Sequence, residues 1–394
     1  MISISRLYCG VAGPNDALRY GAGRSPRPPA NRKPVVVWNC TRRCNLRCIH
    51  CYSRSDDRPC GGEMATAQSL AMLEDLARFG VPVILFSGGE ALMRGDLIEL
   101  VRRAVALGMR AVISTNGTLI TPEVAGRLRE AGVSYVGVSL DGMRSTNDSF
   151  RGREGAFDEA LAGIRNCRQE GIKVGLRFTV TQRNAAEVPE IFSLARDEDI
   201  PRVCFYHLVC VGRGRELRSE ELDHDATRRL VDRIVDRTAA LHAEGPPKEV
   251  LTVDNHADGP YLYLRMVREG SGRASEALRL LRIARGNASG IGIGAVSWDG
   301  SVHPDQFWRS VSLGNVAERK FSEIWSDLSN PLLVRLRDRR AHLRGRCAAC
   351  RFLDVCNGNL RVRAEAATGD AWACDPACYL TDDEIAGDPP GKGE

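Results

Sequence analysis

Three cysteines with close, regular spacing carry the strongest chemical signal in this sequence. Cys44, Cys48 and Cys51 form a C-x3-C-x2-C run directly after a short apolar segment. Three thiolates so close together can hold three irons of a [4Fe-4S] cube and leave the fourth iron open for a ligand. A zinc site is the alternative, because Cys40 or Cys60 could supply the fourth ligand of a closed tetrahedral site.

The composition limits the classes of protein to which the chain can belong. Its 394 residues suffice for one large domain and a smaller one, with 43% hydrophobic and 27% charged residues. We expect a cytoplasmic protein with no membrane or nucleic-acid partner, because no apolar run approaches the roughly 18 residues of a membrane span and no secretory signal is visible. Fourteen cysteines, most of them in two clusters, favour metal sites over disulfides. The net charge of +5 is modest and compatible with an anionic substrate.

Residues 34–212 alternate β-branched runs with helical patterns, which is typical of βα units. The predicted strands are 35–39, 83–87, 111–115, 135–140, 174–180 and 203–207, and the predicted helices lie near 66–79, 95–107, 122–131, 156–170 and 185–199. The fold class is therefore α/β, a partial and open (β/α)6 barrel, and ligands of such sheets gather at the carboxyl ends of the strands.

The rest of the chain divides into four further parts. We expect residues 1–33 to be a flexible lead-in, because they are rich in Pro, Gly and Arg. Residues 213–285 are charged and read as a helical connecting region. Residues 286–385 form a small Cys-rich domain, and residues 386–394 a disordered tail.

Polar residues follow the second and third predicted strands. In Gly88-Gly89-Glu90, the two glycines let the backbone approach a ligand, and the carboxylate can accept from an ammonium group. After the third strand, Ser114 and Asn116 offer polar side chains, although an Asn-Gly turn is an equally good interpretation.

Further polar residues accompany the fourth and fifth strands. Ser139 and Asp141 end the fourth strand, and Arg151 follows. Asp141 could instead cap a helix. Arg177 lies on the fifth strand, and the sequence leaves open whether it points into the barrel or outward.

A predicted hairpin and a second cysteine cluster mark the C-terminal domain. Residues 290–304 read as a β-hairpin closed by Asp299-Gly300. The spacing Cys-x2-Cys-x5-Cys, then Cys-x3-Cys, supplies enough thiolates for one more cluster, and zinc is again the alternative. These cysteines are Cys347, Cys350, Cys356, Cys374 and Cys378.

The triplet and the strand-end motifs resemble those of the radical S-adenosylmethionine (SAM) superfamily. The resemblance implies that the open iron chelates the amino and carboxylate groups of SAM, and that one electron cleaves SAM to a 5'-deoxyadenosyl radical. The signature aromatic is then His50 or Tyr52. The implied SAM contacts are Gly88, Gly89, Glu90, Ser114, Asn116, Ser139, Asp141, Arg151 and Tyr52.

The Cys-rich domain is similar to the SPASM or twitch extension of these enzymes, which carries auxiliary clusters. The full SPASM pattern also has cysteines around the hairpin, where this chain has Asn287, Gly290 and Asp305. The expected cofactors are therefore SAM and two [4Fe-4S] clusters. The auxiliary ligands would be Cys347, Cys350, Cys356 and a fourth thiol, for which Cys378 is favoured over Cys374.

Segments 302–308, 356–366 and 369–380 look like the radical SAM family of haem d1 biosynthesis, NirJ. That resemblance implies a tetrapyrrole substrate, 12,18-didecarboxysirohaem, from which two propionates are removed. It also implies a low-potential electron donor and other haem d1 biosynthesis proteins as partners. Arg361 and Arg363 are candidate propionate contacts, and His303 and Asp141 are candidate catalytic residues.

Three alternatives remain. A radical SAM peptide maturase would have a recognition domain of roughly 80 residues at its N-terminus, and the 33 residues before the barrel are too few. A related haem-forming enzyme would decarboxylate a sirohaem-derived tetrapyrrole. A non-catalytic zinc-binding module would contain neither iron nor sulfide.

Overall fold

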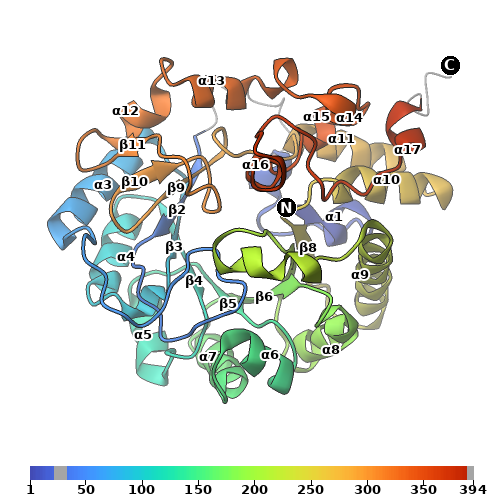
Figure 1. The fold of residues 1–394 in the computed structure, drawn as a ribbon. Helices are drawn as coiled ribbons and strands as arrows, with labels where there is room; N and C mark the ends of the chain where they lie inside the picture. The colour runs from blue at the N-terminus through green and yellow to red at the C-terminus, as the bar shows by residue number, and fades with distance from the viewer. Residues whose placement is uncertain (22–32, 388–394) are drawn as a thin grey trace.

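The computed structural model describes residues 1–21 and 33–387, and an eleven-stranded sheet runs through it (Figure 1). The strand order is β1-β8-β7-β6-β5-β4-β3-β2-β9-β10-β11. Strands β2 to β8 run parallel in chain order, so all their carboxyl ends lie on the same side of the sheet. The sheet curves into an open barrel with helices around its outside (Figure 1).

The six predicted strands are all present, and each agrees with its predicted bounds to within one residue. They are β2 (Val35–Asn39), β3 (Val83–Ser87), β4 (Arg110–Thr115), β5 (Tyr135–Ser139), β6 (Val174–Val180) and β7 (Arg202–His207). Most of their side chains are buried, with Val36, Trp38, Ile84 and Phe86 fully so, and the half-buried ones include Leu85 and Tyr206, which line the interior of the barrel. Burial of both faces is what continuous β-branched runs indicate.

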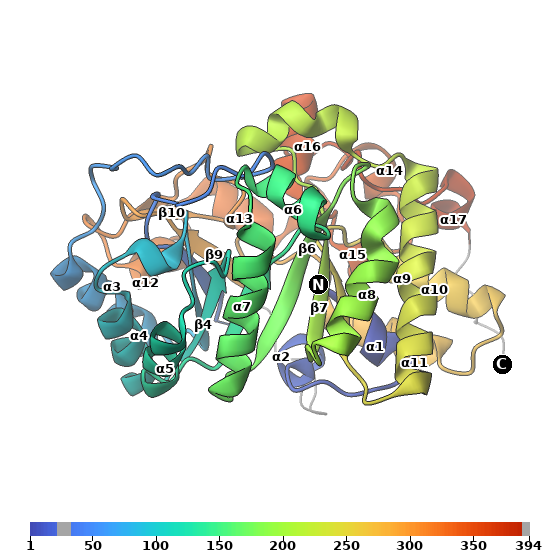
Figure 2. The same ribbon diagram turned by 90° about the horizontal axis from the view of Figure 1, so that it is seen from below.

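The predicted helices are also present, on the outer face of the sheet. They are α3 (Thr66–Phe79), α4 (Leu97–Ala106), α5 (Pro122–Glu130), α7 (Ala156–Gln169) and α8 (Val188–Asp197), with α6 (Arg144–Arg151) and the short 3-10 turns η2 (Ala91–Met93) and η3 (Ala185–Glu187) between them. Helices α7, α8 and α9 (His224–Glu244) stand along the outside of β6 and β7 (Figure 2).

The helical connecting region contains a strand that the sequence analysis missed. After η4 (Gly212–Glu220) and α9, β8 (Glu249–Val253) pairs in parallel with β7, and all five of its residues are buried. The charged residues Lys248 and Glu249 precede its short apolar run. The sequence analysis therefore read the run as part of the charged connecting region. Helices α10 (Asp258–Arg268) and α11 (Ala274–Ala284) complete the region.

The flexible lead-in predicted for residues 1–33 is wrong for its first 21 residues. They form β1 (Ile2–Ser3), α1 (Ile4–Leu7) and α2 (Asp16–Tyr20), and β1 pairs antiparallel with β8. Ile4 and Leu7 are fully buried in the main core, which fixes this segment in place. Residues 22–32 lie outside the described residues, as do 388–394 of the predicted disordered tail.

The predicted hairpin is formed by β9 (Ile293–Val296) and β10 (Ser301–His303), with Gly300 at φ 85° in its turn. Strand β9 also pairs in parallel with β2, so the hairpin extends the barrel sheet. The remaining elements are β11 (Gly314–Asn315), α12 (Phe321–Ser326), α13 (Pro331–Arg337), η5 (Arg339–Ala341), α14 (Gly345–Ala348), α15 (Leu353–Cys356), α16 (Arg361–Thr368) and α17 (Asp382–Ala386). Among the described residues, none of the helices has both the length and the apolar character that a bilayer crossing demands.

Candidate active site

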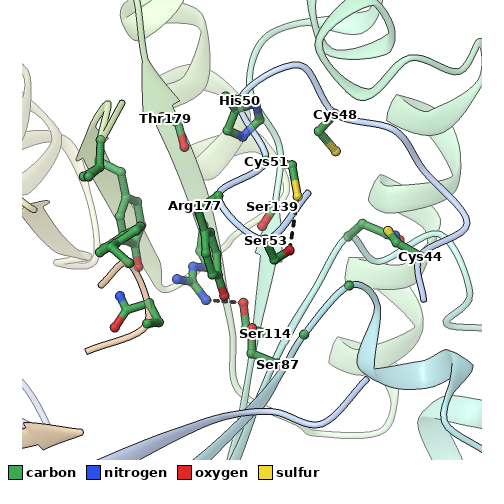
Figure 3. Close-up of a pocket in the computed structure, with 18 of the residues that line it drawn as sticks. Cys44, Cys48, His50, Cys51, Ser53, Ser87, Ser114, Ser139, Arg177 and Thr179 are labelled. Atoms are coloured by element: carbon green, nitrogen blue, oxygen red, sulfur yellow. Dashed lines mark hydrogen bonds between the residues drawn. The ribbon is translucent and has the colours of Figure 1, made fainter. Parts of the chain in front are cut away.

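A cavity opens at the carboxyl ends of the barrel strands, and the cysteine triplet forms part of its wall (Figure 3). Its empty volume, open mouth included, is ≈ 1090 Å³. The cavity is lined by many of the residues that were predicted to bind SAM or the cluster, namely Cys44, Cys48, Cys51, His50, Tyr52, Gly88, Gly89, Ser114, Asn116, Ser139 and Arg151. The structure thus brings together residues from the cysteine loop and from the ends of several strands.

The three thiols of the triplet are unpaired and surrounded by hydrogen-bond donors. Arg151 Nη1 lies 3.5 Å from Cys48 Sγ, and Asn116 Nδ2 lies 3.9 Å from Cys44 Sγ. Burial raises the pKa of the Cys44 thiol to about 12, with nearby Glu90 contributing. Binding iron as a thiolate therefore requires the positive charge of the metal, and loading releases protons.

Gly88 and Gly89 are needed because the cysteine loop packs directly on them. A Cβ on Gly88 would lie 2.3 Å from Thr41 O, and one on Gly89 would lie 2.2 Å from Arg43 O. The Gly89 amide donates to Thr41 O at 2.7 Å. The motif therefore seats the loop at the end of β3 as well as lining the cavity.

Glu90 does not line the cavity, in contrast with its predicted contact to SAM. It is fully buried, and its oxygens accept from Thr115 Oγ1 at 2.8 Å and from the Asn116 amide at 2.8 Å. Burial raises the pKa of this carboxyl, and the hydrogen bonds from these donors lower it again in part. In this structure Glu90 joins the ends of β3 and β4 beneath the cavity wall.

Asp141, a candidate catalytic residue, likewise lies behind the wall. Its carboxylate forms a buried ion pair with Arg151 and accepts a hydrogen bond from the Thr179 amide at 2.7 Å. It also lies 3.2 Å from His50 Nε2. Arg151 reaches Cys48 from this pair. Asp141 therefore positions two cavity residues and does not itself reach the cavity.

The other predicted polar residues hold the wall together. Ser114 accepts a hydrogen bond from Arg177, which settles that Arg177 points into the barrel (Figure 3). The Tyr52 hydroxyl donates to Asn39 Oδ1 at 2.8 Å, and its ring packs edge-on against Phe307.

His303, Arg361 and Arg363 do not line the cavity. Both ring nitrogens of His303 are bonded, to Ser297 Oγ at 3.0 Å and Val311 O at 2.6 Å, so this histidine holds the hairpin. Arg361 donates to the carbonyls of three residues in the Cys-rich domain. Arg363 donates to Asp254 O and lies 3.6 Å from Asp375. The structure gives the two arginines internal partners in place of the expected propionates.

The tail cysteines gather away from this cavity. Burial raises the pKa of the Cys356 thiol, and the neighbouring thiols Cys378, Cys347 and Cys350 raise it further. Cys374 lies close enough to Cys347 to raise the pKa of that thiol, and its Sγ contacts Arg344 O at 3.4 Å. All five tail cysteines therefore belong to one group, in which Cys378 and Cys374 are the two candidates for the fourth ligand.

A single zinc ion and an iron–sulfur cluster require different arrangements of their thiolate ligands. The four ligands of a zinc ion all lie within about 2.3 Å of one point, whereas each thiolate of a cube binds a different iron. Across residues 1–21 and 33–387, no three His, Cys, Asp or Glu side chains converge as a single-ion site.

Several cavity residues were not predicted. They include Tyr206 and His207 at the end of β7, Val209 and Arg213 beyond it, and Gln306 and Phe307 after the hairpin. Asp254 after β8, which we expected in a surface segment in preference to a substrate pocket, lines the cavity as well. Arg213 follows Gly212, whose Cβ would lie 2.3 Å from Tyr52 O. Glycines on both sides of Arg213, a few residues after β7, are a signal of close backbone approach.

The fold and the site define a radical SAM enzyme, and the chain belongs to the radical SAM superfamily. A model of that superfamily matches residues 38–195, and a model of the SPASM iron-sulfur cluster-binding domain matches residues 292–351. The cofactors expected from the sequence, SAM and iron–sulfur clusters, are thereby confirmed.

Several relatives among known proteins are synthases of haem or of related tetrapyrroles. The chain is 58% identical to Fe-coproporphyrin III synthase of Methanosarcina barkeri over 98% of its own length and 99% of the relative's. It is 45% identical to pre-heme d1 synthase of Dinoroseobacter shibae, covering 90% of this chain and 89% of that one. The chain is therefore a radical SAM enzyme of haem biosynthesis that acts on a tetrapyrrole.

Solved structures confirm the fold. Streptococcus suis SuiB bound to S-adenosylmethionine superimposes with a TM-score of 0.71 at 18% identity, over 89% of this chain and 78% of that one. The structure of anSMEcpe with bound AdoMet and a peptide gives a TM-score of 0.66 at 20% identity, over 90% and 96%.

Proposed function

We propose that this enzyme forms Fe-coproporphyrin III from 12,18-didecarboxysirohaem. The observation that carries the proposal is the 58% identity with an Fe-coproporphyrin III synthase along essentially the whole of both chains. Identity at this level, extending through the barrel and the Cys-rich domain, favours a shared substrate pocket as well as a shared cofactor.

The lining of the cavity suits a flat, apolar molecule that carries carboxylates. The rings of Tyr52, Tyr206 and Phe307 offer faces and edges against which a macrocycle can pack. Arg177 and Arg213 add guanidinium groups, the usual partners of carboxylates. One carboxylate, Asp254, lines the same cavity.

The residues of the chain have distinct parts in this reaction. When bound, the cluster and SAM supply a 5'-deoxyadenosyl radical that abstracts hydrogen from the tetrapyrrole. Cys44, Cys48 and Cys51 would hold that cluster, and the Asp141–Arg151 pair fixes the donor to Cys48. The aromatic wall excludes water from the radical.

We propose Cys347, Cys350, Cys356 and Cys378 as ligands of the auxiliary cluster. The effects of Cys378, Cys347 and Cys350 on the Cys356 pKa support this set, and Cys374, which raises the pKa of Cys347, is the alternative fourth ligand. This cluster would exchange an electron with the substrate, and a low-potential donor would supply electrons to the enzyme.

A second candidate function is the formation of pre-haem d1, in which two propionates are removed from the same tetrapyrrole. The 45% identity with a pre-heme d1 synthase over nine-tenths of the chain favours it. The two candidates share the substrate and the radical chemistry and differ in which side chains leave.

Product analysis separates the candidates. The anaerobically reconstituted enzyme is incubated with 12,18-didecarboxysirohaem, SAM and dithionite, and the tetrapyrroles are separated by mass and absorbance. Fe-coproporphyrin III as product supports the first proposal, and a tetrapyrrole that has lost two propionates supports the second. SAM cleavage with an unchanged tetrapyrrole would contradict both and direct the search to peptide substrates. The Cys44/Cys48/Cys51→Ala variant is the control for cofactor-independent conversion.

A further inference from the structure

Arg177 is a cavity-lining cation with no carboxylate partner among the described residues. It lies on β6 and points into the barrel, where it donates to Ser114 Oγ (Figure 3). The ring of Tyr206 lies 4.9 Å from its guanidinium carbon. The Arg177 charge lowers the pKa of Asp254, which lines the same cavity, but none of the ion pairs formed by the described residues includes Arg177.

Other barrel arginines show how this chain normally satisfies such a group. Arg151 pairs with Asp141, and Arg202 pairs with Glu249 at 2.5 Å. Arg202 also stacks over Tyr135, with 4.4 Å between guanidinium carbon and ring centroid, in the same manner as Arg177 over Tyr206. Unlike Arg202, Arg177 therefore has no carboxylate with which it forms an ion pair.

The surroundings of Arg177 hold its guanidinium rigidly. A Cβ on Gly137 of β5 would lie 2.9 Å from Arg177 Cδ, so the glycine makes room for the stem. Ser114 fixes one nitrogen and Tyr206 supports one face of the group. A guanidinium held in this way loses little side-chain entropy when it binds a carboxylate through two parallel hydrogen bonds.

We propose that Arg177 binds a carboxylate side chain of the tetrapyrrole substrate and so orients the macrocycle in the cavity. This inference rests on the proposed tetrapyrrole function. SAM also carries a carboxylate, but that group must reach the open iron beside the triplet. In Figure 3, Arg177 and Thr179 lie on one side of the cavity, and Cys44 and Cys48 lie on the other.

Equilibrium binding tests the proposal without turnover. Fe-coproporphyrin III is titrated anaerobically into the cluster-loaded wild type, Arg177→Met, Arg177→Lys and Arg202→Lys, with absorbance as the readout. SAM binding to each protein is measured separately. Arg202→Lys is the matched control, because Arg202 has the same contact with a tyrosine ring but is already paired with Glu249.

We expect Arg177→Met to weaken porphyrin binding about 10- to 100-fold, the usual worth of a charge-assisted hydrogen bond. Arg177→Lys should recover part of that loss, because lysine keeps the charge without the planar fork. SAM affinity should stay within about twofold in all variants, and Arg202→Lys should bind the porphyrin as the wild type does.

Three results would overturn the proposal. They are unchanged porphyrin binding by Arg177→Met, an equal loss in Arg202→Lys, and weakened SAM binding in place of porphyrin binding. A wild type that binds no iron porphyrin would instead contradict the proposed function itself, so the two failures are distinguishable.

Discussion

The two thiol groups of this protein sit in different surroundings. In the barrel, Cys44 and Cys48 are 6% and 8% exposed, and all three thiols of the triplet face a cavity. In the tail, the thiols are half-buried, and none of them lines that cavity. The triplet thus faces the cavity in which a substrate would bind, whereas the tail thiols lie outside its lining.

The neighbours of the two groups differ as well. The triplet receives two side-chain donors, Arg151 on Cys48 and Asn116 on Cys44, in addition to the Leu46 amide, which donates to Cys44 Sγ at 3.4 Å. In the tail, backbone amides lower the thiol pKa values that burial raises, Phe352 for Cys350 and Leu380 for Cys378. Backbone donors are fixed by the path of the chain. A side-chain donor such as Arg151 depends on its own partner, which here is Asp141.

Removing the triplet should have the largest effect. In Cys44/Cys48/Cys51→Ala we expect the iron content to fall from about eight to about four per chain and SAM cleavage to disappear, because the open iron is lost. Iron and sulfide analysis with a 5'-deoxyadenosine assay measures both. Residual SAM cleavage in this variant would remove the functional distinction between the two groups.

Removing the tail cluster should give the complementary result. Cys378→Ala should lose about four irons and product formation but retain SAM cleavage, because its thiol belongs to the tail group. Cys374→Ala is the matched control and should keep about eight irons. Loss of iron in Cys374→Ala with retention in Cys378→Ala would exchange the two ligand assignments.

Breaking the network behind the triplet should destabilise the fold. Asp141→Asn leaves the Arg151 charge buried without its carboxylate, a loss of about 3–5 kcal/mol in the free energy of unfolding. Arg165→Met, which removes an exposed ion pair with Glu198, should cost less than about 1 kcal/mol. Urea denaturation of the apoprotein measures both values, and equal effects would show that the buried pair has no special weight.

A smaller, pH-dependent effect is expected where the two regions meet. Asp254 lines the cavity, its carbonyl accepts from Arg363 of the tail domain, and burial raises the pKa of its carboxyl to about 6. A raised carboxyl pKa adds stability that is present below the unfolded value of about 3.9 and is lost as the pH rises through about 6.

Asp254→Asn should therefore be as stable as the wild type at pH 4 and more stable at pH 8, by about 3 kcal/mol in the free energy of unfolding. Asparagine suits the site, because residue 254 has φ 66° and asparagine tolerates the left-handed region. Denaturation curves at the two pH values test this. A constant difference between the proteins at both pH values would exclude titration of Asp254 as its cause.

Much of the barrel could be predicted from the sequence because its signals are local. Each strand from β2 to β7 is a β-branched run long enough to be recognised alone, and each is followed by a helix of ordinary length. The cysteine spacing and Gly88-Gly89 are equally local. Strand β8 was not predicted because Glu249-Val-Leu-Thr-Val lies among charged helices, and its pairing with β7 and β1, which are distant in sequence, makes it a strand.

The role of each polar residue could not be predicted, because it depends on which partner the fold supplies. Asp141 and His303 have residue types suited to catalysis. In the fold, however, Asp141 pairs with Arg151, and His303 bonds to the backbone carbonyl of Val311. Arg361 and Arg177 are both arginines in motif-rich segments. Arg361 donates its hydrogen bonds to backbone carbonyls, whereas Arg177 faces the cavity.

The pairing of β9 with β2 has a consequence for how the protein is made. Val36 pairs with Gly294, so this edge of the strand that leads into the cysteine loop stays open until some 258 further residues have been synthesised. Contacts between segments so distant in sequence form late and slow folding. The sheet that supports the cluster loop is therefore complete only after the ribosome has synthesised most of the polypeptide.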